Sequence, residues 1–138
     1  MKFALAILTL LLAACGRVDL PVHSAAQELR DAFVREANAH GVALTIDDVP
    51  LVLVGPVEGE STMAACLPSG QVVIAETWRN ESAVYLEPLA FHEYGHCVLG
   101  LSHATDCAID IMALDGVGHD PYWNNRDALL DELFRYTR

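Results

Sequence analysis

The segment His92-Glu93-Tyr94-Gly95-His96 constrains the fold of this chain more than any other part of its sequence. Its two histidines are four positions apart, and such positions lie on one face of an α-helix, so both imidazoles can point at one metal ion. This HExxH spacing is typical of zinc sites on a helix, where the glutamate can accept a proton from a water molecule at the metal. We therefore expect a helix here, with His92 and His96 as zinc ligands and Glu93 as general base.

The residues that follow supply a candidate third ligand and a residue that can end the helix. Gly100 lies four positions after His96, His103 lies three positions after the glycine, and an Ile111-Met112 pair follows. We expect His103 to be the third zinc ligand, because three protein ligands leave a fourth position for water, as in catalytic zinc sites. Three other side chains further along the chain could take its place: Asp106, Asp110 and His119.

This combination resembles the metzincin clan of zinc peptidases, whose motif is HExxHxxGxxH followed by a methionine turn. The present chain has three residues between His96 and Gly100, where the clan has two. One added residue turns a helix by about 100° and lengthens it by about 1.5 Å, so the chain must leave the helix in a different direction to bring His103 to the same site. We expect Gly100 to permit this, since glycine tolerates positive φ at a helix C-terminus. The resemblance implies that Met112 supports the site from the turn beneath it.

The longer motif also resembles a group of small bacterial lipoproteins that carry a zinc-metallopeptidase signature. They share a His-Cys pair after HExxH, a later Ile-Met pair and an acidic-aromatic C-terminal helix. The resemblance covers about residues 66–138 and is specific within 92–112. It implies an α+β fold, a minimal metzincin-like zinc peptidase domain with a small mixed sheet, an active-site helix and a C-terminal helix.

Three cysteines, Cys66, Cys97 and Cys107, lie in the expected domain. In an exported protein they can form one disulfide and leave one free thiol. The resemblance favours a pair of Cys66 with Cys97, which would tie a strand to the active-site helix, and Cys107 with either partner is the alternative. We do not expect Cys97 to bind the metal, because it adjoins His96 and faces about 100° away from it on a helix.

The N-terminus resembles the signal peptide of a bacterial lipoprotein. A basic start precedes an apolar stretch, residues 3–12, which is too short to span a bilayer. The sequence Leu-Ala-Ala-Cys then matches a lipobox, so we expect residues 1–14 to be removed and Cys15 to carry acyl chains. Gly16 favours the outer membrane of a Gram-negative cell, facing the periplasm or the cell surface. A plain signal peptide with an incidental cysteine is the alternative.

Removal of this segment leaves about 124 residues, enough for one domain of modest size. We expect a lipidated tether at 15–23 and a metallopeptidase-like domain at 24–138. The formal net charge is −11 for the whole chain, and loss of Lys2 makes the mature side chains −12. Such an acidic body repels nucleic acid and anionic headgroups, so we expect no nucleic-acid partner and membrane attachment through the lipid.

Apolar residues at helical spacing predict two helices near the ends of the domain. The first begins with Ser24 as its N-cap, runs to about His40 and ends at Gly41, and the second covers residues 127–136. Strand-like runs lie between the first helix and the HExxH segment, and a turn at 67–70 joins the last two into a hairpin. The expected strands cover residues 42–46, 51–54, 63–66 and 71–75.

The expected active-site helix begins with Ser82 as its N-cap and runs to about Leu99. Pro88 lies in its interior, where proline removes one backbone hydrogen bond. It either kinks the helix or marks a later start near Glu87.

We expect zinc-dependent hydrolysis of a peptide or protein substrate by a membrane-anchored, monomeric lipoprotein. Glu93 would pass the water proton to the leaving amine, and a negative cleft would favour basic peptides. The alternative is a non-catalytic zinc-binding lipoprotein or interaction module, but a structural site needs no glutamate at this position. We expect Tyr122 and Trp123 to pack or to line the cleft, because the clan's tyrosine follows the methionine by two positions, where this chain has Leu114.

Overall fold

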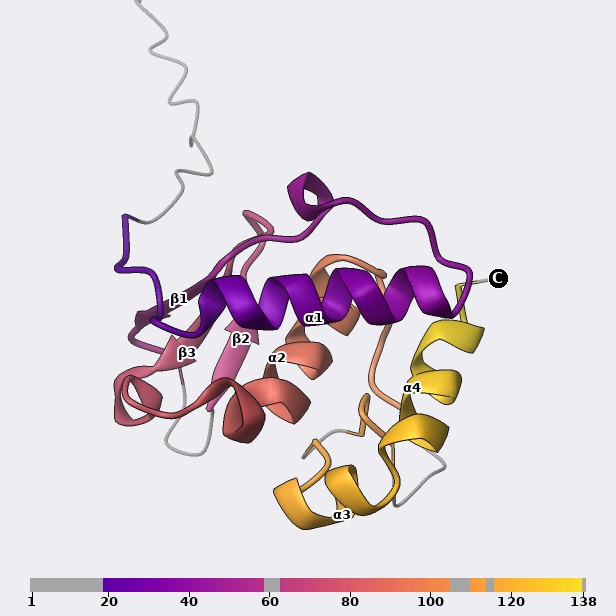
Figure 1. Ribbon diagram of the computed structural model, residues 1–138. Helices are drawn as coiled ribbons and strands as arrows, with labels where there is room; N and C mark the ends of the chain where they lie inside the picture. The colour runs from indigo at the N-terminus through magenta and orange to yellow at the C-terminus, as the bar shows by residue number, and fades with distance from the viewer. Residues whose placement is uncertain (1–18, 59–62, 105–109, 114–115, 138) are drawn as a thin grey trace, which may run out of the picture.

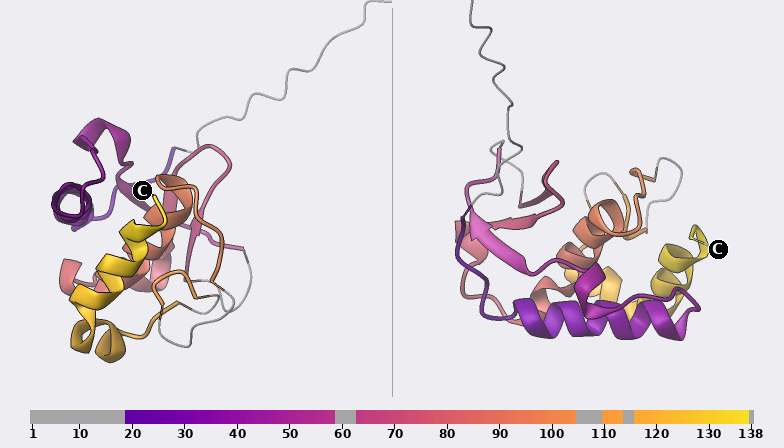
Figure 2. Two further views of the ribbon diagram at one scale, coloured as in Figure 1. Left: turned by 90° about the vertical axis from the view of Figure 1, so that its right-hand side faces the viewer. Right: turned by 90° about the horizontal axis from the view of Figure 1, so that it is seen from above.

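Helix α2 (Ala83–Cys97), which carries the HExxH segment, lies at the centre of an α+β fold (Figure 1). The sheet flanks α2 on one side, α4 (Arg126–Arg135) flanks it on the other, and α1 (Ala26–Ala39) runs across, as the view from above in Figure 2 shows. The expected α+β class is confirmed. The computed structural model describes residues 19–58, 63–104, 110–113 and 116–137.

The sheet is small and mixed, as expected. Its strands are β1 (Val52–Gly55), β2 (Ala64–Cys66) and β3 (Val72–Ala75), in the order β1-β3-β2. Strand β3 pairs parallel with β1 and antiparallel with β2, so the predicted hairpin of the last two strands is confirmed. The outer edge of β1 bridges from Leu53 to Val22, so part of the segment that the sequence assigned to a tether packs against the sheet.

The strand expected at residues 42–46 is wrong. Residues 42–45 pair with no strand, and the 3₁₀ turn η1 (Ile46–Asp48) follows them. The Asp48 carboxylate accepts hydrogen bonds from the backbone N–H of Thr45 at 2.7 Å and from its hydroxyl at 2.8 Å, and these bonds lower the pKa of Asp48. Because β1 bonds to β3 on one edge and bridges to Val22 on the other, it offers this segment no free edge.

Helix α1 forms where expected, but Ser24 is not its N-cap. The helix begins after Ala25, whose backbone N–H donates to Nδ1 of the buried His23 at 3.0 Å. The second ring nitrogen of His23 lies 3.1 Å from the carbonyl oxygen of Trp78, so this imidazole joins the helix start to the segment after β3. Gly41 has a φ of 82° and follows the helix end, as expected.

Ser82 caps α2 as expected, because its hydroxyl oxygen accepts the backbone N–H of Tyr85 at 3.4 Å. The helix continues through Pro88, so the later start considered for it is wrong. It ends at Cys97 rather than at Leu99, because the last turn widens before the chain leaves the helix axis.

Pro88 leaves the carbonyl of Val84 without the N–H that an α-helix would offer it. The indole N–H of Trp123, on helix α3 (His119–Asn124), takes that place and donates to the Val84 carbonyl at 3.2 Å. A contact between helices thus replaces a bond within α2. Helix α3 was not expected from the sequence, because six residues that include a proline show no periodic pattern.

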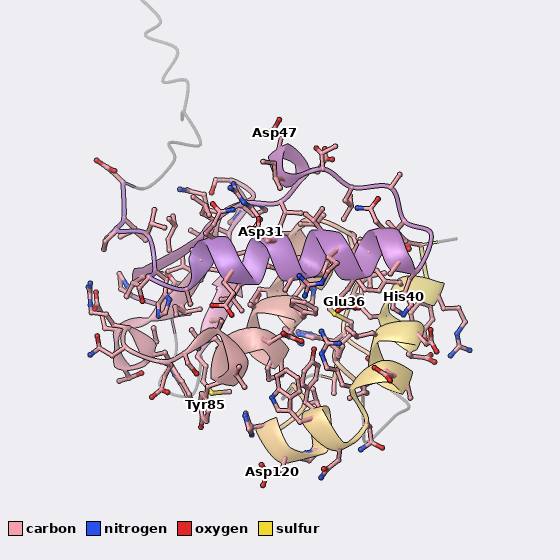
Figure 3. All side chains as sticks on the ribbon, in the orientation of Figure 1. Asp31, Glu36, His40, Asp47, Tyr85 and Asp120 are labelled. Carbon is pink, nitrogen blue, oxygen red and sulfur yellow. A yellow bond between two sulfur atoms is a disulfide. The ribbon has the colours of Figure 1, made fainter. Side chains whose placement is uncertain are left out.

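A partly buried polar cluster joins α1, α2, α3 and α4. The Tyr122 hydroxyl and the Arg126 Nε each donate to Oε1 of Glu87 at 2.7 Å, and the Arg126 guanidinium also donates to Glu36 at 2.9 Å. Figure 3 shows Glu36 on the side of α1 that faces α4. Burial and the bond to Glu87 raise the pKa of Tyr122, which stays a neutral donor and packs in the fold, as expected.

Aromatic rings fill the space where α1, α2 and α4 meet. Phe33 lies 5.0 Å from Phe91, 4.9 Å from Tyr94 and 5.5 Å from Phe134, measured between ring centroids. Helix α4 matches the expected closing helix and turns its apolar face toward this cluster. Within the described residues, we find no helix long and apolar enough to cross a membrane.

We predict that Trp123→Phe destabilises the wild type more than it destabilises a Pro88→Ala variant. In the wild type, the substitution leaves the Val84 carbonyl unpaired, whereas the variant regains a backbone N–H that can bond to it. The coupling in the free energy of unfolding, measured by denaturant titration of all four proteins, should be about 0.5–1 kcal/mol. Equal losses in the two backgrounds would contradict the coupling.

Candidate metal centre

Three imidazoles meet beside α2 and form the candidate metal centre. His92 and His96 lie one turn apart on α2, and His103 reaches them from the segment after the helix. Nε2 of His96 lies 3.2 Å from Nε2 of His92 and 3.1 Å from Nε2 of His103. His92 is buried and His103 is exposed, so the group opens to solvent on one side. The expected grouping of these three side chains is confirmed.

The separations between these nitrogens fit a metal ion. Nitrogen ligands about 2.0–2.1 Å from a tetrahedral zinc ion lie about 3.3–3.4 Å from one another. The observed separations of 3.1 and 3.2 Å are close to these values. All three ligand nitrogens lie within 4.8 Å of one another, so they surround a space that one metal ion could occupy.

Backbone carbonyls fix the tautomer of the two histidines on α2. Nδ1 of His92 lies 2.5 Å from the carbonyl oxygen of Ile111, and Nδ1 of His96 lies 2.7 Å from that of Leu101. A carbonyl only accepts, so each Nδ1 donates, and in the neutral ring each Nε2 carries a lone pair. Lone pairs that face each other at this distance repel unless a cation or a proton lies between them. The group is therefore suited to hold a metal ion.

The last turn of α2 accommodates the longer spacing of the motif. The Leu99 N–H bonds to the Tyr94 carbonyl at 3.2 Å, five positions back, and the Leu101 N–H bonds to the Gly95 carbonyl at 2.9 Å, six positions back. An α-helical bond spans four positions, so this turn is wide in the manner of a π-helix. Gly100 takes a φ of 68°, as expected for a glycine at this point. The wide turn brings the Leu101 carbonyl back to the second histidine of α2.

Met112 lies against α2 on the side of Gly95. It is buried, and a Cβ added to Gly95 would overlap its sulfur, so the glycine permits the close approach. This contact holds the turn at 110–113 against the helix, and Ile111 in the same turn bonds to His92. Met112 therefore packs against the helix that carries His92 and His96, where the resemblance implied a structural support for the centre.

Glu93 is 5% exposed and lines the same cleft as the three imidazoles. Its carboxylate accepts a hydrogen bond from the backbone N–H of Cys66 on β2. Burial raises the pKa of Glu93, while His96 and the bond from Cys66 act in the opposite direction. Burial also lowers the pKa of His92, which the bond to Ile111 partly opposes. The lowered pKa keeps His92 neutral, as a metal ligand must be, and the raised pKa makes the Glu93 carboxylate a stronger base.

A disulfide joins Cys66 to Cys97, as expected; their Cα atoms are 5.5 Å apart, and the two cysteines are 31 positions apart in the sequence. It fastens the edge strand β2 to the end of α2. Because Cys66 also donates its N–H to Glu93, the bond holds a partner of that carboxylate beside the helix. The alternative pairings with Cys107, which lies outside the described residues, are thereby excluded.

The centre opens into a cleft of about 880 Å³. Three aromatic rings form one wall: Trp78 stacks on Tyr85 at 5.4 Å, and Tyr85 stacks on His119 at 5.1 Å between centroids. Figure 3 shows Tyr85 at the outer surface of the molecule. The sequence contained no signal for this wall, because its rings come from the segment after β3, from α2 and from α3.

The alternative third ligands do not join the imidazoles within the described residues. Oδ1 of the buried Asp110 accepts the backbone N–H of Met112 at 2.7 Å. His119 belongs to the aromatic wall, and its Nδ1 lies 3.1 Å from a carboxylate oxygen of Asp120. Asp106 lies outside the described residues.

Comparison with protein-family models, with curated proteins and with solved structures finds no match for this chain. The structure shows a three-histidine group suited to a metal ion in a small α+β fold. The function of the group is therefore inferred from its own geometry and chemistry.

We predict that the protein binds one divalent metal ion and that His103→Ala lowers the metal affinity by more than about 100-fold. Loss of a residue that only hydrogen-bonds to a metal ligand usually has a smaller effect. The reason is that His103 supplies one of three converging nitrogens. His119→Ala is the matched control, since it removes a histidine of the same cleft that lies outside the group. Elemental analysis and chelator competition measure the effect. Unchanged affinity in His103→Ala would exclude it as a ligand.

Proposed function

We propose that the protein is a zinc-dependent peptidase that cleaves peptide bonds in this cleft. The observation that carries the proposal is the convergence of three Nε2 atoms beside the buried Glu93 in an open cleft. Imidazole nitrogens suit zinc, and three protein ligands leave one position for water. A purely structural site needs no carboxylate at the position of Glu93 within the HExxH segment.

In this proposal His92, His96 and His103 hold the zinc ion. When bound, zinc supplies a Lewis acid that polarises the scissile carbonyl and lowers the pKa of a water molecule toward about 7. Glu93 accepts the proton of that water molecule and returns it to the leaving amine. The N–H of Cys66 orients the carboxylate, and burial raises its pKa, which makes it a stronger acceptor of the water proton.

Among the described residues, no strand pairs with the outer edge of β2, and this edge favours an extended peptide as the substrate. Strand β2 is at the edge of the sheet and lines the cleft. The Met63 carbonyl accepts the N–H of Ala75, and the Leu67 N–H donates to the carbonyl of Gln71, so the backbone groups of Met63 and Leu67 face β3. Backbone groups alternate in direction along a strand, so those of Ala64 and Cys66 face the outer edge of β2. Cys66 uses its N–H for Glu93, which lies at that edge. An extended peptide could add to this edge through main-chain bonds and so cross the centre.

We predict that Glu93→Gln keeps zinc but loses about 10²–10⁴-fold in peptide cleavage, because an amide of the same size cannot accept the proton. Zinc content and cleavage of a peptide library would be measured side by side for both proteins. Glu76→Gln, which changes an exposed carboxylate outside the cleft lining, should cleave as the wild type does.

Equal cleavage by the wild type and Glu93→Gln would refute the assigned mechanism. Failure of the zinc-loaded wild type to cleave any member of the library would instead support the alternative, a non-catalytic zinc-binding protein or interaction module.

We further propose that the protein is held in the bacterial cell envelope by a lipid on Cys15. The lipobox at 12–15 supports the proposal, although Cys15 lies outside the described residues. The disulfide between Cys66 and Cys97 is consistent with an oxidising compartment.

We predict that Cys15→Ser removes the acyl mass and releases the protein from membranes, because the thiol is the site of lipid attachment. Mass spectrometry and membrane fractionation of the protein produced in a Gram-negative host would measure both effects. Cys107→Ser is the control, as it changes a cysteine outside both the lipobox and the disulfide. Unaltered membrane partitioning of Cys15→Ser would contradict the anchor.

A further inference from the structure

We propose that Asp110 is a positioning residue of the metal centre, which holds the turn that orients His92 and supplies negative charge for the bound cation. The inference rests on the metal site of the proposed function, but not on its hydrolytic activity. Its support comes from the hydrogen bonds of the turn and from the burial of the Asp110 carboxylate.

Asp110 shapes the turn at 110–113 through both its backbone and its side chain. Its carbonyl accepts the N–H of Ala113 at 3.1 Å, and its Oδ1 accepts the N–H of Met112 at 2.7 Å. A side-chain oxygen that bonds the backbone two positions later is a common way to stabilise a turn. The carboxylate thus determines the direction of the peptide groups between these residues.

Those peptide groups hold the centre from two sides. The Ile111 carbonyl accepts the Nδ1 proton of His92 at 2.5 Å. The Met112 carbonyl accepts the N–H of Ala104 at 2.7 Å, and Ala104 directly follows His103. The turn at 110–113 therefore orients His92 and anchors the chain beside His103. A distortion of this turn would displace the Nε2 atoms of both histidines.

The charge of Asp110 has no compensation in the protein part that the structure describes. Asp110 is 2% exposed, its Oδ2 has no hydrogen-bond partner there, and no basic side chain pairs with it. Glu87, a second buried carboxylate, is paired with Arg126. An unpaired buried carboxylate is costly unless a cation offsets it. Three neutral imidazoles contribute no charge, so Glu93 and Asp110 together would balance a divalent ion at the centre.

Two substitutions of Asp110 separate the effect of its negative charge from the effect of its hydrogen bond to the turn. Asp110→Asn keeps an oxygen that can accept the Met112 N–H and removes only the charge, whereas Asp110→Ala removes both. Asp48→Asn is the matched control, because Asp48 accepts a backbone N–H in the same way but at the exposed turn η1. Zinc affinity by chelator competition, thermal unfolding of the metal-free and zinc-loaded full chain, and the absorption spectrum of the cobalt-loaded protein would be measured.

We expect Asp110→Asn to lower zinc affinity about 10–100-fold, while the metal-free unfolding midpoint stays the same or rises. Asp110→Ala should lose more affinity, change the cobalt spectrum and lower the metal-free midpoint, and Asp48→Asn should leave the affinity unchanged. Wild-type zinc affinity in Asp110→Asn would overturn the proposal, as would a wild type that binds no metal. A wild type that binds zinc without cleaving peptides would refute only the proposed hydrolysis and would leave this inference standing.

Discussion

The candidate metal centre depends on two hydrogen bonds that reach α2 from outside the helix. Helical spacing puts His92 and His96 on one face, but rotation of each ring leaves either nitrogen free to point toward a shared ion. The carbonyls of Ile111 and Leu101 remove that freedom, because each accepts a proton from Nδ1 and leaves Nε2 as the ligand atom. The centre therefore depends on the placement of two peptide groups that are not part of the HExxH segment.

The surrounding fold holds those peptide groups in place. The wide last turn of α2 returns the Leu101 carbonyl to the helix, and Met112 packs against Gly95 to fix the turn that contains Ile111. Further from the centre, the aromatic cluster around Phe33 and the charged cluster around Arg126 hold α2 against α1 and α4. The disulfide joins the other side of the helix to β2. The helix is thus supported by a separate interaction on each of its sides.

Local sequence patterns predicted the elements that are stabilised mainly by contacts within a short segment, and those with one clearly apolar face. The hairpin of β2 and β3, the Ser82 cap and the closing helix α4 belong to this group. The strand at 42–46 and the Ser24 cap were wrong. Strand β1 pairs with β3 on one edge and bridges to Val22 on the other, so it has no edge for the expected strand. Helix α1 begins after Ala25, whose N–H bonds to His23, and no side chain caps it.

The sequence by itself determined that three histidines and a glutamate could share one site, since helical periodicity and a glycine at the helix end are encoded locally. It also indicated, through a family resemblance, the disulfide between Cys66 and Cys97, and that disulfide is present in the structure. Only the tertiary structure decided which nitrogen of each ring faces inward, how the added residue is absorbed, and that the Asp110 carboxylate is buried against the Met112 N–H. These features depend on contacts between residues far apart in the chain, and no periodicity within one segment records such contacts.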